Sequence, residues 1–299
     1  MEKNYLFTGV APALITPFTA DDEIDEPAMR KLIDWQVESG VDALVVLGTT
    51  GENATVWPEE RRRIVDLAVE HTAGRVPVII GAGNNSTSES IGFSKEAAAS
   101  GADALLIVGP YYNKPTQAGF VAHVKAIAEA ADKPIILYNV PGRTSFNIAA
   151  DTVLQLAEEV PSVVGIKEAS GDLAQISDIL MGRPEKLAVY SGDDEMTLPM
   201  IALGAHGVVS VLSNVLPEPV SRMVRTALGG RIDEARRLHF ELVPAMRACF
   251  VETNPIPVKT VLASMGIMNG RLRLPLVDIS EANRPRLLEV FEAHLQEKV

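Results

Sequence analysis

The run Ser39-Gly-Val-Asp-Ala-Leu44 recurs almost unchanged as Ser100-Gly-Ala-Asp-Ala-Leu105 and, more loosely, as Leu203-Gly-Ala-His-Gly-Val208. In each copy a glycine follows a segment with helical periodicity, as is common just after a helix ends. A short apolar run then begins, as at the start of a buried strand. The repeat therefore marks a helix-to-strand junction, and its period is one βα unit.

Short apolar runs rich in β-branched residues alternate with helical segments from the N-terminus to Gly230. The apolarity of these runs is continuous, which is typical of strands buried on both faces. The expected strands are Val10–Thr16, Ala43–Leu47, Val76–Gly81, Ala104–Val108, Pro134–Asn139, Val163–Lys167, Leu187–Ser191 and Gly207–Leu212. The expected helices are Pro27–Glu38, Pro58–Thr72, Ser86–Ser100, Phe120–Ala131, Ala149–Glu159, Leu173–Met181, Met196–Leu203 and Glu218–Leu228.

This alternation predicts an α/β protein with a closed (β/α)8 barrel, the TIM-barrel architecture. An open doubly wound sheet is the competing fold, but no expected strand leads into a GxGxxG turn. After Gly230 the alternation stops, and the predicted helices are Ile232–Phe250, Pro257–Met265 and Ser280–Gln296. We therefore expect a catalytic barrel domain over residues 1–230 and a helical C-terminal domain over residues 231–299.

Composition excludes several classes of protein. The chain has 299 residues, of which 47% are hydrophobic, so it can bury a large core. A formal net charge of −12 argues against a nucleic-acid partner, because phosphate binding needs clustered basic residues. The single cysteine, Cys249, and five histidines without ligand spacing predict no disulfide framework and no metal site. No apolar run is long enough for a membrane span and no targeting signal is visible, so we expect a soluble, cytoplasmic protein.

Polar side chains gather directly after the expected strands. In a (β/α)8 barrel the C-terminal strand ends meet at one mouth, where active sites lie. The polar strand ends are Gly48-Thr-Thr-Gly-Glu52, Gly109-Pro-Tyr-Tyr-Asn-Lys-Pro115, Tyr138-Asn-Val-Pro-Gly-Arg-Thr144, Lys167-Glu-Ala-Ser-Gly171, Ser191-Gly-Asp-Asp194 and Val209-Ser210. We expect these side chains to face one another around that mouth.

Lys167 is the most reactive candidate in this set, because it ends the apolar run Val163–Ile166. Burial disfavours an ammonium ion, and the neutral amine is the form that attacks a ketone or aldehyde to make a Schiff base. A lysine that lays its stem on apolar surface and reaches water is the alternative. Glu168 should point to the opposite face of the strand, which indicates a structural role.

Three neighbours suit Schiff-base chemistry. The hydroxyl of Tyr138, on the adjacent strand, could carry protons to and from a carbinolamine. The pair Thr49–Thr50 could bind a carboxylate or relay a proton, and Arg143 offers a bidentate fork for a second carboxylate. Each also has a purely structural reading: an amphipathic strand tyrosine, a turn that closes a strand, and an exposed loop arginine.

Together these stretches resemble the dihydrodipicolinate synthase (4-hydroxy-tetrahydrodipicolinate synthase) family of Schiff-base-forming pyruvate lyases. The matching runs, in family order, are Gly9-Val-Ala-Pro-Ala-Leu-Ile-Thr-Pro-Phe18, Gly48-Thr-Thr-Gly-Glu52, Pro110-Tyr-Tyr-Asn-Lys-Pro115, Tyr138-Asn-Val-Pro-Gly-Arg-Thr144, Gly165-Ile-Lys-Glu-Ala-Ser-Gly171, Ser191-Gly-Asp-Asp194 and Asn254-Pro-Ile-Pro-Val-Lys259. The resemblance implies a lyase that condenses pyruvate with aspartate semialdehyde in lysine and diaminopimelate biosynthesis. It also implies that no metal or organic cofactor is needed, because the lysine supplies the electron sink.

The resemblance further implies the catalytic roles. Lys167 forms the Schiff base with pyruvate, and Tyr138 is the proton donor and acceptor. Thr49 and Tyr112 complete a proton relay with Tyr138. In this family the tyrosine at the position of Tyr112 reaches into the site of a neighbouring subunit, which implies a homotetramer built as a dimer of dimers.

The implied substrate-binding residues are Thr50, Val209, Gly192 and Arg143. Thr50 and the backbone at Val209 would hold pyruvate, and Arg143 would bind the carboxylate of aspartate semialdehyde. N-acetylneuraminate lyase and 2-keto-3-deoxy sugar-acid aldolases share the lysine and the tyrosine, but Arg143 and Tyr112 favour the synthase. A non-catalytic binding barrel is the other alternative, although such a protein would be expected to lose Lys167 or Tyr138.

Feedback inhibition by lysine is where the sequence departs from the family pattern. Lysine-sensitive relatives use imidazole-type residues in the segment that corresponds to 54–61, where this chain has Pro58 and Arg61, while Asn85, Glu89 and Tyr111 still match. Pro58 donates no hydrogen bond, and Arg61 would repel the lysine ammonium group. We therefore expect lysine inhibition to be weak or absent.

Overall fold

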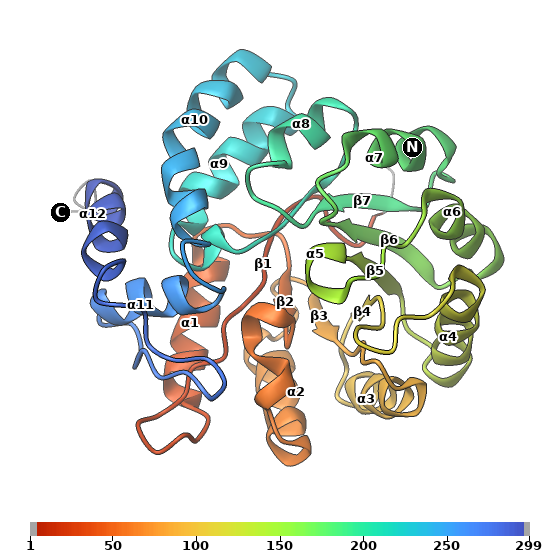
Figure 1. Ribbon diagram of the computed structural model, residues 1–299, viewed down its shortest axis with the longest axis horizontal. Helices are drawn as coiled ribbons and strands as arrows, with labels where there is room; N and C mark the ends of the chain where they lie inside the picture. The colour runs from red at the N-terminus through yellow and green to blue at the C-terminus, as the bar shows by residue number, and fades with distance from the viewer. Residues whose placement is uncertain (1–4, 296–299) are drawn as a thin grey trace.

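The computed structural model describes residues 5–295 and shows eight parallel strands surrounded by helices (Figure 1). The hydrogen-bonded strand order is β1-β8-β7-β6-β5-β4-β3-β2. A bridge between Ala13 and Val45 joins the two edges and closes the barrel. The strands are β1 (Gly9–Pro12), β2 (Leu44–Val46), β3 (Val78–Gly81), β4 (Ala104–Val108), β5 (Ile135–Asn139), β6 (Val163–Glu168), β7 (Ala188–Ser191) and β8 (Gly207–Ser210). The predicted fold class is confirmed.

The helices follow the predicted order, with one addition. They are α1 (Glu26–Glu38), α2 (Pro58–Thr72), α3 (Thr87–Ala99), α4 (Gln117–Ala130), α5 (Pro141–Thr144), α6 (Ala150–Glu159), α7 (Leu173–Gly182), α8 (Thr197–Ala202), α9 (Pro217–Leu228), α10 (Ile232–Ala248), α11 (Ile256–Ser264) and α12 (Arg284–Leu295). Short 3-10 turns η1 (Thr49–Gly51), η2 (Asn53–Thr55) and η3 (Leu212–Asn214) follow β2 and β8. The unpredicted helix, α5, is a single turn, which is too short to show helical periodicity.

Several predicted boundaries were wrong for identifiable reasons. The expected strand Val10–Thr16 ends at Pro12. Beyond it Ala13 still donates its N–H to the Ser210 carbonyl of β8, but Leu14 donates to the Val45 carbonyl of β2, so the chain crosses to β2 and closes the barrel. The expected strand Gly207–Leu212 ends at Ser210, because the chain turns into η3, which begins at Leu212. The third strand starts at Val78, since Pro77 has no N–H to donate to the ladder.

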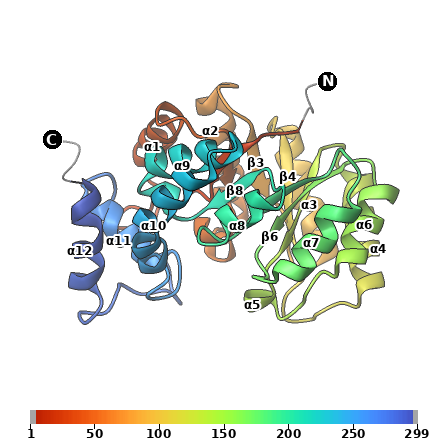
Figure 2. The same ribbon diagram turned by 90° about the horizontal axis from the view of Figure 1, so that it is seen from above.

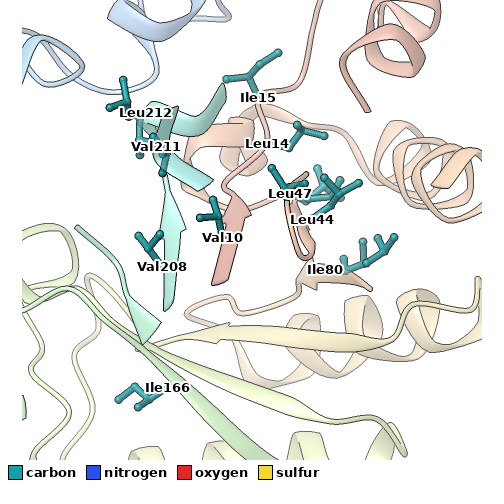
Figure 3. Close-up of a cluster of buried hydrophobic side chains, with 14 of the residues drawn as sticks. Val10, Leu14, Ile15, Leu44, Leu47, Ile80, Ile166, Val208, Val211 and Leu212 are labelled. Atoms are coloured by element: carbon teal, nitrogen blue, oxygen red, sulfur yellow. The ribbon is translucent and has the colours of Figure 1, made fainter. Parts of the chain in front are cut away.

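Two hydrophobic clusters flank the strands, and together they explain the continuous apolar runs. Val10 and Val208 belong to the layer between strands and helices, part of which Figure 3 shows. Their neighbours Ala11 and Val209 belong to a separate cluster inside the barrel. Because consecutive residues of a strand face opposite sides, both faces must be apolar.

The C-terminal helices lie at one end of the molecule, with α12 outermost (Figure 2). The first of them, α10, packs on α9 of the barrel, and α12 packs on both α10 and α11. The predicted helix Ser280–Gln296 begins at Arg284, and its expected last residue lies outside the described part of the chain.

Within residues 5–295, no helix combines the length and apolarity that crossing a bilayer requires.

Candidate active site

Lys167 and Tyr138 lie side by side on the inner face of the barrel. Register pairs Lys167 of β6 with Tyr138 of β5 on one side and with Tyr190 of β7 on the other. The Lys167 Nζ lies 4.2 Å from the centroid of the Tyr138 ring. Lys167 is only 5% exposed and Tyr138 6%, so this amine does not extend into solvent as a surface lysine does. At that distance the face of the ring attracts the amine whenever the amine is protonated.

Alternation along β6 separates the amine from the neighbouring carboxylate. Ile166 and Glu168 face the helices, so Lys167 faces the barrel axis. Glu168 is buried and accepts hydrogen bonds from Asn139 Nδ2 at 3.0 Å and from the Ser170 N–H at 2.7 Å. Burial raises the pKa of Glu168, and these hydrogen bonds partly oppose the rise. The geometry agrees with a structural role for Glu168, which ties together the ends of β5 and β6.

Gly192, directly after β7, lies against the stem of Lys167. A Cβ at this position would lie 2.7 Å from Ala169 Cβ and 3.0 Å from Lys167 Cε. Both distances are shorter than normal carbon–carbon contacts. The space beside the lysine therefore exists because residue 192 has no side chain.

The Thr49–Thr50 pair forms η1 at the mouth, immediately after β2. Thr50 is buried, and its Oγ1 accepts a hydrogen bond from Asn254 Nδ2 at 2.8 Å. Thr16 also holds this turn, because its hydroxyl donates to the Gly51 carbonyl at 2.7 Å. Within the described chain, no hydrogen bond joins the hydroxyls of Thr49 and Tyr138.

The remaining candidates occupy different places. Arg143 lies on α5, is largely exposed, and donates from Nη2 to the Asn254 carbonyl at 3.4 Å. Val209 is buried on β8, beside Ala11 of β1. Tyr112 is 90% exposed and so extends away from the protein that surrounds Lys167. The structure thus brings Lys167, Tyr138 and Gly192 together, and it leaves Tyr112 apart from them.

Asn254 and Lys259 are rim residues to which sequence reasoning assigned no role. Lys259 of α11 is fully buried and forms an ion pair with Glu52, the residue that ends η1. Burial lowers the pKa of Lys259 to about 8, although the Glu52 carboxylate opposes this. The signal was present in the sequence, because Lys259 interrupts the apolar run Ile256–Leu262 much as Lys167 ends its own run.

Across residues 5–295, no three histidine, cysteine, aspartate or glutamate side chains are grouped so as to hold a metal ion. Around the mouth lie an amine, hydroxyls, an amide and a guanidinium. Such a set can bind carboxylates and move protons around a covalent imine.

Comparison with known proteins identifies the family. The model of the dihydrodipicolinate synthetase family matches residues 6–294. The chain belongs to this family. It is 62% identical over 294 residues to the 4-hydroxy-tetrahydrodipicolinate synthase of Salinibacter ruber, covering 98% of this chain and 97% of that protein. The resemblance inferred from the sequence is confirmed.

Solved structures of dihydrodipicolinate synthases share the whole architecture. The enzyme from Aquifex aeolicus superposes with a TM-score of 0.95 at 44% identity, covering 97% of this chain and 98% of that one. A protein described as the first monomeric dihydrodipicolinate synthase variant superposes with a TM-score of 0.94 at 42% identity, covering 96% of each chain. The barrel and the C-terminal helices are therefore both features of the dihydrodipicolinate synthase fold.

Proposed function

We propose that this chain is a 4-hydroxy-tetrahydrodipicolinate synthase, a lyase that condenses pyruvate with aspartate semialdehyde through a Schiff base on Lys167. The observation that carries the proposal is the buried Lys167 amine, 4.2 Å from the Tyr138 ring centroid on the inner face of the barrel. The 62% identity to a curated synthase over nearly the whole chain supports the same activity.

The proposed reaction begins with attack of the neutral Lys167 amine on the keto carbon of pyruvate. The carbinolamine loses water to give an iminium ion, and loss of one methyl proton turns this ion into an enamine. The enamine carbon then attacks the aldehyde carbon of the second substrate, whose oxygen takes up a proton. Finally the amine of that substrate attacks the imine carbon, closes the ring and releases Lys167.

Protons must move at each of these steps, and we propose that the Tyr138 hydroxyl moves them. In our proposal Thr49 of the same chain and Tyr112 of a second copy connect the Tyr138 hydroxyl to solvent. The 90% exposure of Tyr112 supports its contribution to another subunit rather than to its own site. We accordingly propose a homotetramer made of two dimers, acting in the cytoplasm.

Two carboxylates need separate binding groups. We propose that Thr50 and the backbone at Val209 hold the carboxylate of pyruvate, beside the space that Gly192 leaves open. Arg143, at the outer rim on α5, would bind the carboxylate of aspartate semialdehyde with its guanidinium. A sugar-acid substrate would instead require a pocket for several hydroxyls, so Arg143 favours the short amino aldehyde.

Borohydride trapping tests this function directly. The protein is reduced in the presence of pyruvate, digested and analysed by mass spectrometry, and the adduct is expected on Lys167. Lys167→Met should abolish the adduct. Lys186→Met should leave it unchanged, because Lys186 is an exposed lysine that lies just before the start of β7. Absence of an adduct on Lys167 in the wild-type protein would refute the proposal. Turnover with a panel of aldehydes then decides between aspartate semialdehyde and sugar-derived substrates.

The division of the chain also remains our proposal. Residues 1–230 would form the catalytic barrel domain, and residues 231–299 a helical C-terminal domain. The support is that α10, α11 and α12 follow the last strand with no further strand among the described residues.

A further inference from the structure

We propose that Asn254, from the C-terminal helical segment, is a positioning residue for pyruvate. Its side-chain amide holds the Thr50 hydroxyl so that the hydroxyl proton is left to donate to the substrate carboxylate. This inference rests on the proposed function, because it takes Thr50 as a pyruvate-binding residue.

The direction of the hydrogen bond carries the argument. Asn254 Nδ2 lies 2.8 Å from Thr50 Oγ1, and an amide nitrogen can only donate. A hydroxyl has one proton and two acceptor positions. Asn254 therefore occupies an acceptor position of Thr50 and leaves its single proton for another partner. The opposite arrangement, with an acceptor at residue 254, would consume that proton.

The burial of both residues supports a specific role for the hydrogen bond between Asn254 and Thr50. Asn254 is 4% exposed and Thr50 3%, and the two residues are 204 positions apart in the chain. The other polar atom of the Asn254 side chain, Oδ1, is buried without a hydrogen-bond partner among the described residues. A buried unpaired acceptor is costly. A residue that served only to fill space would avoid this cost, so the donating nitrogen is the part of Asn254 that we expect to matter.

A second contact holds the same turn in place. Five residues after Asn254, Lys259 of α11 pairs with Glu52 at the end of η1. The Lys259 Nζ also donates to the Arg271 carbonyl at 2.9 Å and lies 4.2 Å from the centroid of the Phe18 ring. The segment from Asn254 to Lys259 therefore contacts the η1 turn at two residues, Thr50 and Glu52. Both contacts limit how far the η1 turn can move.

Asn254 also touches the proposed site of the second substrate. Its carbonyl accepts the 3.4 Å hydrogen bond from Arg143 Nη2. One residue therefore contacts the groups assigned to both carboxylates. Since the Arg143 contact uses the backbone, substitution of the Asn254 side chain isolates the effect on Thr50.

The test measures how much pyruvate is needed for half-maximal borohydride trapping at Lys167. For Asn254→Ala we expect a rise of roughly 3–10-fold, the size expected for one neutral hydrogen bond. For Asn254→Asp we expect roughly 10–100-fold, because the nearly isosteric carboxylate takes the Thr50 proton and brings a negative charge close to the substrate. At saturating pyruvate the rate of trapping should match the wild type in both variants.

Two further measurements separate positioning from a general structural effect. In a Thr50→Val background, Asn254→Ala should cause no additional change, because the hydroxyl that it orients is gone. The defect of Asn254→Asp, taken relative to the wild type at each pH, should shrink as the pH falls, since a protonated carboxyl group can donate to Thr50 again. Asn269→Asp provides a matched control, because it makes the same chemical change at an exposed position of the C-terminal segment.

The outcomes are distinguishable. If wild-type protein gives no adduct, the proposed function fails and this inference fails with it. If the wild type is trapped but Asn254→Asp needs no more pyruvate than Asn269→Asp, the function stands and the inference is refuted. Equal effects of Asn254→Ala in the wild-type and Thr50→Val backgrounds would also refute it. Should Asn254→Ala fail to fold, the nearly isosteric aspartate variant still decides.

Discussion

Replacement of Gly192 by alanine should displace the reactive lysine without unfolding the protein. The new Cβ would lie 2.7 Å from Ala169 Cβ, 3.0 Å from Lys167 Cε and 3.1 Å from Lys167 Cγ. Carbon atoms pack at about 3.5–4.0 Å, so the overlap amounts to about 1 Å. The backbone has little room to retreat, because the Gly192 N–H donates to the Glu168 carbonyl at 2.7 Å and the Ala169 N–H to the Asn139 carbonyl at 2.8 Å. The flexible Lys167 side chain must therefore move.

The size of the effect follows from this displacement. A misplacement of about 1 Å at a reacting group costs roughly 10²-fold in rate, so we expect kcat/KM to fall by about that factor. Overpacking should cost about 1–3 kcal/mol of stability, which lowers Tm by several degrees but leaves the protein folded. Steady-state kinetics, the rate of borohydride trapping and a thermal melt measure these quantities.

A control glycine shows whether any Gly→Ala change would do the same. Gly92, within α3, has no atom within 4 Å of the position of an added Cβ. Gly92→Ala should therefore leave activity unchanged and raise stability by about 0.5–1 kcal/mol, as expected inside a helix. If Gly192→Ala kept wild-type kinetics and wild-type trapping, the assignment of the space beside Lys167 would be wrong.

Three further predictions concern the proton donor, regulation and pH. Tyr138→Phe keeps the ring beside Lys167 but lacks the hydroxyl, so turnover should fall by roughly 10²–10⁴-fold while some pyruvate adduct still forms; near-normal turnover would contradict the role of Tyr138. Lysine should inhibit weakly or not at all, since Arg61 is buried against the Phe93 ring and stays cationic at neutral pH, its pKa lowered by burial only to about 10; half-inhibition at sub-millimolar lysine in a dose–response assay would overturn this. Burial raises the pKa of Glu168 above its usual 4.5, so the stability that its protonated form contributes is lost as the pH rises through the raised pKa. The Tm of Glu168→Gln relative to wild type should therefore increase from about pH 4 upward, and a pH-independent difference would contradict the shift.

Most of the barrel could be predicted from the sequence, because its strands are buried on both faces and leave uninterrupted apolar runs. The direction of Lys167 could be predicted too, since alternation places it opposite Ile166 and Glu168. The closure between β1 and β2 could not, because Ala13 and Leu14 continue an apolar run whether they pair with β8 or with β2. Similarly, α5 occupies only Pro141–Thr144, too few residues for a periodic pattern.

The site divides in the same way. The ends of the predicted strands indicate which residues lie at the barrel mouth, because parallel strands all end at the same rim. This reasoning led to Lys167, Tyr138 and Thr50. It did not lead to Asn254, which follows a helix and reaches Thr50 across 204 positions of the chain. The placement of Tyr112 in solvent was likewise visible only in three dimensions.

By itself, the sequence determined the eightfold alternation, the place of Lys167 at a strand end and the family, since each of these depends on local periodicity or on motifs in order. The tertiary structure alone decided which distant groups meet: Gly192 against the Lys167 stem, Asn254 on Thr50, and Lys259 on Glu52. The physical reason is that hydrophobic periodicity encodes which face of an element is buried, whereas a hydrogen bond or a close contact between distant segments depends on how those buried faces finally pack.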